Sequence, residues 1–242
     1  MKTTKNNKDK KIFIVMPAYK AAATLKKTYQ DIPKEFKKNI ILVDDGSPDS
    51  TVEEAKKLGL KIIKHEHCIG YGGNQKTCYN AALKKGADII VLLHPDHQYD
   101  PKMVKDLVKP IVNEEADFTF GSRFADGRNP LEGGMPFYRY MGNRFTTFIE
   151  NLFLNTNFSE LHSGFKAYNR KLLENLPYKD YSNNFFFDSQ ILIDSVYSEF
   201  KIKEVSIPTR YNQESSSIGI KGSLVYIMQT IFYVIKRRLK SK

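Results

Sequence analysis

Apolar and polar positions alternate in blocks along the first half of the chain. Short runs of Ile, Val and Leu are separated by segments in which apolar residues recur at helical spacing. A continuous short apolar run is typical of a strand covered on both faces, and spacing of three and four residues is typical of an amphipathic helix. The pattern predicts strands at 11–16, 39–51 (ending in acids and turn residues), 60–65, 87–94 and 117–123, and helices at 22–32, 50–59, 74–86 and 101–113.

This alternation predicts an α/β fold, with a mostly parallel sheet and helices on both of its faces. Ligands of such sheets bind beyond the carboxyl ends of the strands. The predicted strands and their connections deliver four polar or glycine-rich segments to that edge. They are Pro17-Ala18-Tyr19, Asp44-Asp45, the Gly70–Gly73 loop and His94–Gln98.

The fourth segment, in IVLLHPDHQYDP, offers ligands for a hard metal ion. The carboxylate of Asp96 and the amide oxygen of Gln98 suit Mg²⁺ or Mn²⁺ on a diphosphate, which shares its coordination between protein, phosphate and water. Asp45 suits a base or a ribose. Two alternatives stay open: a polar turn at Asp96 before Pro101, and a zinc site at His94 and His97, for which no third ligand is evident.

Several other nucleotide sites are excluded by the motifs. The chain has no GxxxxGK[ST] phosphate loop and no G-x-S-x-G elbow, and GYGGN lacks the third glycine of the dinucleotide fingerprint. The net charge of +11 lies mainly at the ends, with +4 in residues 1–11 and +5 in 236–242, which leaves +2 for the rest. That distribution argues against a nucleic-acid partner, which needs a basic folded face. Two cysteines without a CxxC pair favour a reducing compartment.

Seven segments together resemble family 2 glycosyltransferases with the GT-A fold, in the branch of the dolichyl- and polyprenyl-phosphate sugar transferases. They are IVMPAYKAAATL, LVDDGSPDST, GYGGNQKTCYNAA, LLHPDHQYDP, FGSRF, SGFKAYNR and FFFDSQILI…KIKEVSIPTRY, from residue 12 to about 220. The resemblance implies a Rossmann-like sheet and a nucleotide-sugar donor cradled by Pro17, Ala18, Tyr19 and Asp45. It also implies that Asp96 is the metal-binding acid of the D-x-D motif, with Gln98 beside it and His94 in place of the first acid.

Cationic side chains are expected to neutralise the diphosphate as it departs. We assign Gly73 and Lys76 to the donor site, and Arg123, Arg139 and Arg210 to phosphate or acceptor binding. For each cation a solvated surface position is the alternative. The function expected is a metal-dependent, inverting transfer from a UDP- or GDP-sugar to a lipid phosphate, or to a glycan or lipid hydroxyl. A catalytically impaired GT-A domain that binds a membrane or a partner is the alternative, and a nucleotidyltransferase is less favoured.

Asp188 follows three phenylalanines in NNFFFDSQILI and has two interpretations. It can cap the helix that follows, or it can act as the general base on an acceptor hydroxyl. Its alignment with the base of inverting family members favours catalysis. A phosphate acceptor is already anionic and needs no base.

The chain is expected to divide into a basic disordered leader (1–11), the GT-A domain (12–220) and a C-terminal amphipathic, basic helix (221–242). Residues 224–235 are apolar nearly all round, with a stripe at Leu224, Ile227, Met228, Ile231 and Ile235. The run is too short to span a bilayer. One face is expected to pack on the domain, and the other to lie in a membrane interface, with tyrosines at headgroup depth. This predicts a cytoplasmic enzyme on the cytoplasmic face of a membrane; burial of that face against another subunit is the alternative.

Overall fold

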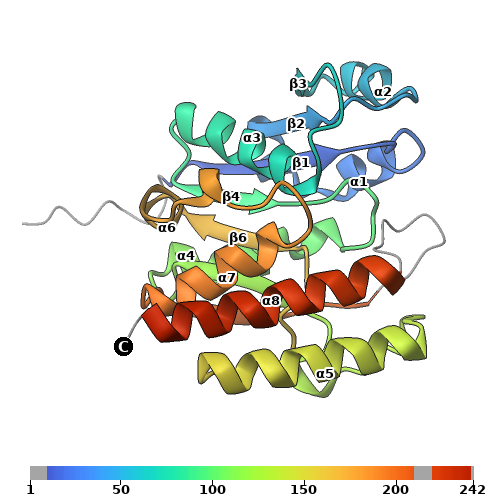
Figure 1. Ribbon diagram of the computed structural model, residues 1–242. Coiled ribbons are helices and arrows are strands. Elements are labelled where there is room, and N and C mark those ends of the chain that lie inside the picture. Colours follow the sequence, from blue (N-terminus) through green and yellow to red (C-terminus); the bar gives the residue numbers. More distant parts are fainter. Residues whose placement is uncertain (1–9, 210–219, 241–242) are drawn as a thin grey trace, which may run out of the picture.

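A seven-stranded sheet forms the centre of the molecule (Figure 1). The computed structural model describes residues 10–209 and 220–240. The strand order is β3-β2-β1-β4-β6-β5-β7, and only β6 runs antiparallel to its neighbours. The predicted α/β fold with a mostly parallel sheet is confirmed. The strands are β1 (Ile12–Ala18), β2 (Ile40–Asp44), β3 (Lys61–Lys64), β4 (Ile89–Leu92), β5 (Phe118–Ser122), β6 (Lys166–Asn169) and β7 (Ile202–Ser206).

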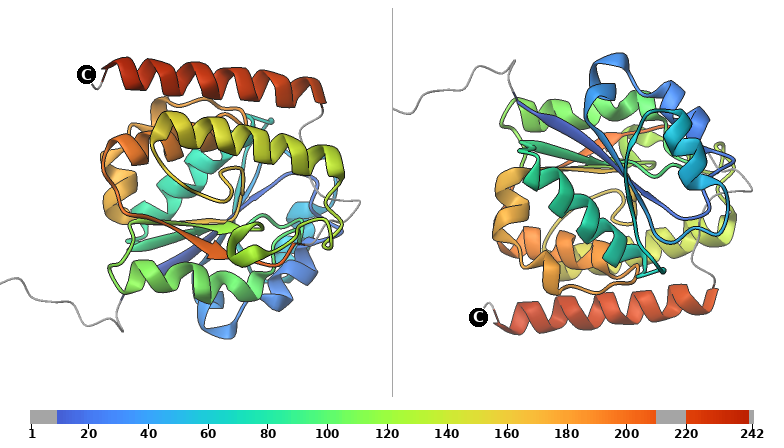
Figure 2. Two further views of the ribbon diagram at one scale, coloured as in Figure 1. Left: turned by 90° about the horizontal axis from the view of Figure 1, so that it is seen from below. Right: turned by 90° about the horizontal axis from the view of Figure 1, so that it is seen from above.

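Helices cover both faces of the sheet (Figure 2). One face packs on α1 (Leu25–Asp31), α2 (Thr51–Lys57) and α4 (Val104–Val112), and the other on the remaining five α-helices. These five are α3 (Tyr71–Lys84), α5 (Phe137–Leu154), α6 (Arg170–Asn175), α7 (Phe187–Tyr197) and α8 (Ile220–Lys240). Short 3-10 helices are η1 (Lys34–Asn39), η2 (Pro101–Met103), η3 (Ala125–Gly127) and η4 (Tyr178–Asp180).

Among the element boundaries that differ from the sequence prediction, two at the ligand edge affect the site. β1 continues through Pro17 to Ala18, because its pairing with β4 ends at Val15↔Leu92, before the proline whose missing N–H would break a ladder. The helix predicted from residue 74 begins at Tyr71, so Gly72 and Gly73 lie inside its first turn. The expected glycine-rich loop is therefore mostly helix.

α8 packs on the rest of the domain through polar as well as apolar contacts. Val234 is fully buried, and the Tyr226 hydroxyl lies 3.0 Å from Nδ1 of His162 and 2.6 Å from Oγ of Ser189. The Tyr233 hydroxyl donates to Oδ2 of Asp194 at 3.0 Å. The prediction that these tyrosines lie at headgroup depth is wrong, because their hydroxyls face the buried Ser189 and Asp194 on α7 and the partly buried His162 before β6. The expected packing of one helix face on the domain is confirmed.

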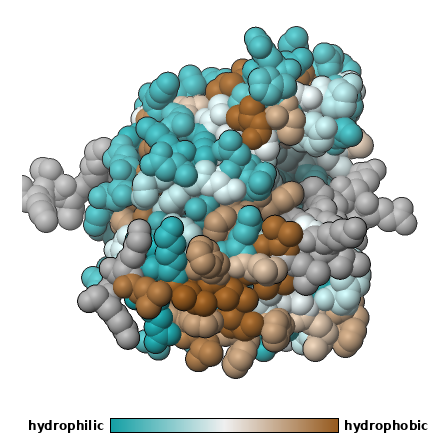
Figure 3. Space-filling view, viewed as in Figure 1, coloured by the Kyte–Doolittle hydropathy of each residue, from teal (hydrophilic) through white to brown (hydrophobic). Residues whose placement is uncertain are grey.

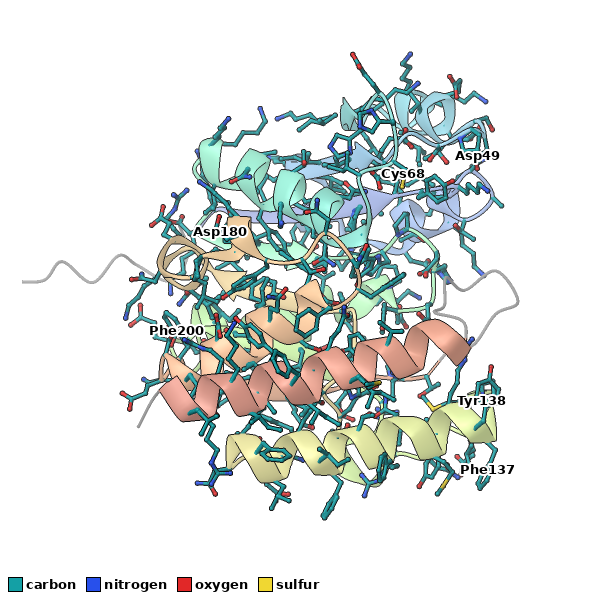
Figure 4. The ribbon with its side chains drawn as sticks, in the orientation of Figure 1. Asp49, Cys68, Phe137, Tyr138, Asp180 and Phe200 are labelled. Atoms are coloured by element: carbon teal, nitrogen blue, oxygen red, sulfur yellow. The ribbon has the colours of Figure 1, made fainter. Side chains whose placement is uncertain are left out.

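The outer faces of α5 and α8 form one exposed apolar surface, which we call the two-helix surface (Figure 3). The two helices pack side by side, and both begin at the end of the molecule where the parallel strands finish (Figure 1). Phe137 and Tyr138 lie at the outer end of α5 (Figure 4). The exposed residues fall at helical spacing, at Phe137, Met141, Phe145, Phe148 and Leu152 on α5 and at Val225, Met228, Phe232, Ile235 and Leu239 on α8.

The charges of the two-helix surface are all positive. α8 contains no acid, and the single acid of α5, Glu150, is buried. Arg144, Lys236 and Arg238 are exposed. No helix in residues 10–209 or 220–240 is long and apolar enough to cross a membrane.

Candidate active site

The Asp45 carboxylate, directly after β2, holds the loop that leads into α3. It accepts hydrogen bonds from the backbone N–H of Ile69 (2.9 Å) and Gly70 (3.1 Å), from the Cys68 thiol (3.1 Å) and from Nδ1 of His65 (2.8 Å). Burial by itself raises the pKa of Asp45, but these donors outweigh it and lower the pKa below its usual value. The carboxylate predicted to bind the nucleotide is thus already a stabiliser of this loop.

The glycines of GYGGN let the loop before α7 approach the start of α3. The carbonyl of Asn183 accepts from the N–H groups of Gly72 (2.7 Å) and Gly73 (3.3 Å). A β-carbon at Gly72 would lie 2.4 Å from the carbonyl oxygen of Ser182, so no other residue fits there. Nζ of Lys76 donates to Oδ1 of Asn183 at 2.8 Å and to the carbonyl of Tyr181. Lys76 and Gly73 therefore meet residues 181–183, and their contact with the donor stays a prediction.

The segment after β4 carries the predicted metal ligands. The backbone N–H of Gln98 donates to Oδ1 of Asp96 at 3.0 Å, which holds the two residues together in a tight turn. His97 has a φ of 57°, and its Nε2 lies 2.9 Å from Oδ2 of Asp31 on α1. His97 thus belongs to another contact. The described part of the chain contains no group of three or more His, Cys, Asp and Glu side chains that could hold a metal, so the zinc alternative has no support there.

His94 packs in a column of rings above the end of β4. Its ring stacks on Tyr71, with centroids 5.5 Å apart and planes 12° apart, and Tyr71 stacks on Phe185 at 4.4 Å. The Tyr71 hydroxyl lies 3.2 Å from Nε2 of His94. Burial lowers the pKa of His94, although the negative charges of Asp96 and Asp188 act in the opposite direction.

Asp188 lies at the centre of a buried cluster that joins α3, β6 and α7. Its Oδ2 accepts from the Tyr71 hydroxyl at 2.8 Å and lies 3.1 Å from Nζ of Lys166, while its Oδ1 accepts from Nε2 of Gln75 at 3.2 Å. α7 begins at Phe187 after an N-cap at Phe186, so Asp188 is in the first turn. The helix-cap interpretation of Asp188 is therefore wrong.

Lys166 is the buried cation of this site. It is the first residue of β6, pairs in register with Leu92 of β4, and its side chain is only 2% exposed. Burial lowers the pKa of Lys166, and the neighbouring Asp188 opposes that effect. Burial and the Asp188 charge also raise the pKa of Tyr71 well above its usual value.

The predicted arginines occupy different surroundings. Arg123 is buried and pairs with the fully buried Glu160, with Nε 3.0 Å from Oε1 and its own backbone N–H donating to Oε2 at 2.8 Å. Arg139, on α5, lies beside Tyr138, with Nε 3.2 Å from the hydroxyl. Arg210 lies outside the described residues. The structure thus gives Arg123 an internal partner, and the phosphate roles of all three stay predictions.

Pro17 and Ala18 form the end of β1, beside the end of β2, and Tyr19 follows directly after the strand. The backbone N–H of Asp45 donates to the carbonyl of Ala18 at 2.9 Å, and the buried Asn74 amide donates to the carbonyl of Val43 at 3.1 Å. Tyr19 is half exposed. These contacts place three of the predicted donor-binding segments at one edge of the sheet.

Sequence reasoning missed Tyr71, Gln75 and Lys166 as parts of the site. Lys166 carried a signal, because a lysine between Phe165 and Ala167 in a strand is a buried charge that needs a partner. Tyr71 lay inside the predicted Gly70–Gly73 segment, but nothing singled out its hydroxyl, and Gln75 is an ordinary residue of a helix start.

The chain matches the family model described as glycosyl transferase family 2 over residues 13–176. The chain belongs to that family. Family 2 glycosyltransferases are enzymes that use nucleotide-sugar donors, and this chain is one of them.

Two archaeal relatives resemble this family 2 chain over nearly its whole length. An uncharacterized protein of Methanocaldococcus jannaschii is 34% identical over 93% of this chain and 94% of its own. UDP-N-acetylglucosamine–dolichyl-phosphate N-acetylglucosaminyltransferase of Methanococcus voltae is 30% identical, with the same coverage. The fold is similar to glucosyl-3-phosphoglycerate synthase of Mycobacterium tuberculosis, solved with Mn²⁺, UDP and glucosyl-3-phosphoglycerate. That structure has a TM-score of 0.72 and 19% identity, over 95% of this chain and 80% of the other.

Proposed function

We propose that this chain transfers a sugar from a UDP- or GDP-linked donor to the phosphate of a lipid-linked acceptor, with inversion and with a bound Mg²⁺ or Mn²⁺. A phosphate oxygen of the acceptor forms the new bond to the sugar C1. The bond from C1 to the donor diphosphate breaks, and its electron pair leaves with the diphosphate. The Methanococcus relative, whose name includes dolichyl phosphate, supports this acceptor.

The observation that carries the lipid acceptor is the two-helix surface. Ten large apolar side chains on α5 and α8 are exposed at helical spacing, and the charges among them are positive. Soluble monomers rarely expose an apolar patch of more than a few hundred Å², so this one suits a membrane interface with anionic lipid. It begins at the end of the molecule where the site lies, which would bring a lipid-linked phosphate to the site (Figure 1).

The chemistry of Asp188 supports a phosphate over a hydroxyl acceptor. Three donors, from Tyr71, Gln75 and Lys166, already engage this carboxylate. A hydroxyl acceptor would need it to take up a proton at the cost of those interactions. A phosphate needs no proton removed.

The residues after β4 fit a divalent metal. Asp96 supplies a carboxylate and Gln98 an amide oxygen, within one turn of chain. Such hard oxygen donors, with the remaining positions taken by diphosphate and water, are the usual Mg²⁺ and Mn²⁺ environment. When bound, the metal neutralises the charge that develops on the departing diphosphate. Asp45, with the loop it holds, remains the proposed floor of the nucleotide site.

Transfer assays with paired acceptors test this proposal. Purified protein with Mn²⁺ is given a panel of UDP- and GDP-sugars and vesicles that contain polyprenyl phosphate or the matching polyprenol. We expect transfer to the phosphate and none to the alcohol. Transfer to the alcohol would contradict the acceptor assignment. If the protein neither transfers the sugar nor hydrolyses the donor with any member of the panel, a catalytically impaired, surface-binding domain would be favoured instead.

A further inference from the structure

His94 is held in one orientation, although it stands where a second acidic metal ligand is expected. Its ring stacks on Tyr71 at 5.5 Å, and Tyr71 in turn stacks on Phe185 at 4.4 Å. A β-carbon on Gly164 would lie 3.2 Å from both Cδ2 and Nε2 of His94, so that ring edge is against the backbone. A side chain packed on its face and on one edge presents its remaining edge in a defined direction.

The hydrogen bonds around Tyr71 define which nitrogen of His94 carries the proton. Tyr71 has one hydroxyl proton, and its oxygen lies 2.8 Å from Oδ2 of Asp188 and 3.2 Å from Nε2 of His94. The carboxylate of Asp188, paired with Lys166 at 3.1 Å, can only accept. The Tyr71 proton therefore points to Asp188, and the Tyr71 oxygen accepts the N–H of His94 Nε2. In neutral His94 the lone pair then lies on Nδ1.

We propose that Nδ1 of His94 is a direct ligand of the catalytic divalent metal, beside Asp96, and that Tyr71, Asp188 and Lys166 are positioning residues for it. This rests on the proposed function, which places a metal-bound diphosphate at this edge. Metal-binding histidines almost always donate their other ring N–H to an acceptor that fixes the tautomer. Here that acceptor is Tyr71, which Asp188 and Lys166 orient in turn.

The atoms that bind the metal determine which metal this site prefers. Two oxygen donors from Asp96 and Gln98 with one imidazole nitrogen make a mixed set, whereas Mg²⁺ favours oxygen alone. Imidazole binds Mn²⁺ and later transition ions better than it binds Mg²⁺. The inference therefore predicts Mn²⁺ over Mg²⁺ for this chain, and a shift toward Mg²⁺ when His94 is replaced by an acid.

Pulsed electron paramagnetic resonance on the Mn²⁺–UDP complex tests the proposed ligand. Wild-type protein with natural isotopes should show ¹⁴N modulation from a directly bound imidazole. Protein labelled only with ¹⁵N-histidine should replace it by ¹⁵N coupling, which excludes nitrogen atoms of UDP. His94→Asp should abolish the coupling while Mn²⁺ still binds, and should raise the Mg²⁺ affinity relative to Mn²⁺.

Two further variants separate a ligand from a neighbour. His97→Asn is the matched control, because asparagine tolerates the left-handed φ of 57° at that position. It should keep the histidine coupling. Tyr71→Phe keeps the ring column but removes the acceptor of the Nε2–H, so Mn²⁺ affinity should fall by about 10–100-fold, with the coupling retained at saturating metal.

The outcomes distinguish this inference from the proposed function. If Mn²⁺ binds with UDP but no histidine nitrogen is coupled in the labelled wild-type protein, His94 is not a ligand and the inference is overturned. If Mn²⁺ does not bind in the presence of UDP, the metal dependence of the proposed function fails, and the inference fails with it. The wild-type measurement decides the matter even where a variant does not fold.

Discussion

Asp45 and Asp188 are both carboxylates at the ligand edge of the sheet, yet their partners come from very different distances along the chain. The donors to Asp45 are 20 to 25 residues away, in a single loop. Two donors to Asp188 are 113 and 117 residues away, on α3. Asp45 therefore closes a local loop, whereas Asp188 ties together elements from three parts of the chain. Substitutions around Asp188 should therefore destabilise the fold more than substitutions around Asp45.

Lys166→Met should give the largest effect on stability, because it leaves Asp188 as an uncompensated charge in a mostly buried site. We expect the free energy of unfolding to fall by about 3–5 kcal/mol, measured by urea denaturation. The control is Lys203→Met, whose partner Glu115 is 2.7 Å away in a pair that is half exposed. Its loss should be far smaller, because an exposed ion pair contributes little to stability. Equal losses of unfolding free energy in the two variants would show that the buried Lys166–Asp188 pair matters no more to stability than an exposed pair.

The double variant Asp188→Asn with Lys166→Met tests whether the unpaired charge of Asp188 causes the loss of stability. Asparagine carries no charge to be left unpaired, so the double variant should recover part of the stability lost in Lys166→Met. An additive double variant would show that the Lys166–Asp188 pair carries no coupling energy.

Asp96→Asn should cost activity with little change in melting temperature, in contrast to Lys166→Met. We expect a loss of at least ~10²-fold in the transfer rate, because a principal metal ligand is neutralised. The amide oxygen can still accept from the N–H of Gln98. His94→Ala should cost less, since Asp96 keeps its charge. A greater loss in His94→Ala would overturn the assignment of Asp96 as the main ligand.

Asp100→Asn is the control for Asp96→Asn in the same segment. Asp100 accepts from the backbone N–H of Lys102 at 3.1 Å and caps the start of η2. Its replacement should leave the transfer rate close to that of the wild type.

Asp45→Asn should destabilise the loop at residues 65–70. It should also make the free energy of unfolding less dependent on pH in the acid range. The folded pKa of Asp45 lies below its ordinary 3.8, so the stability it contributes is present above that value. It is lost as the pH falls through the folded pKa. We expect a loss of about 1–3 kcal/mol at pH 7, with less dependence on pH below 4 than in the wild type. The free energy of unfolding, measured from pH 2 to 7, checks both expectations. If its dependence on pH below 4 is the same in the variant and the wild type, the pKa of Asp45 is not lowered in the folded protein.

Charge reversal on the two-helix surface should give the smallest effect on stability and a selective effect on membranes. Arg238→Glu should weaken co-sedimentation with anionic vesicles, by roughly 1 kcal/mol for each charge removed near the surface. High salt should weaken the binding of the wild type as well. Lys105→Glu, exposed on α4 across the sheet, is the matched control and should bind as the wild type does. Equal loss in both would indicate a general charge effect.

The sequence supported some parts of the site better than others. Asp96 and Gln98 could be placed at the ligand edge because they follow the buried strand β4 within six residues, and the parallel sheet dictates where its strands end. The loop function of Asp45 could not be found, because nothing in VDDGS indicates that residues 65–70 turn back onto it. For α8, periodicity revealed two faces but not which one docks, since Tyr226 and Tyr233 suit an interface as well as buried polar partners.

The sequence by itself determined the element order, the parallel sheet and the edge where the ligands gather, because apolar periodicity and strand direction are local properties. The tertiary structure decided which side chains meet. Lys166 reaches Asp188 only because β6 enters the sheet antiparallel beside β4, with its first residue at the carboxyl end of that strand. The apolar stripes of α5 and α8 form one surface only because the two helices pack side by side and leave both stripes exposed. Such contacts join residues far apart in the chain, where local patterns carry no information about distance.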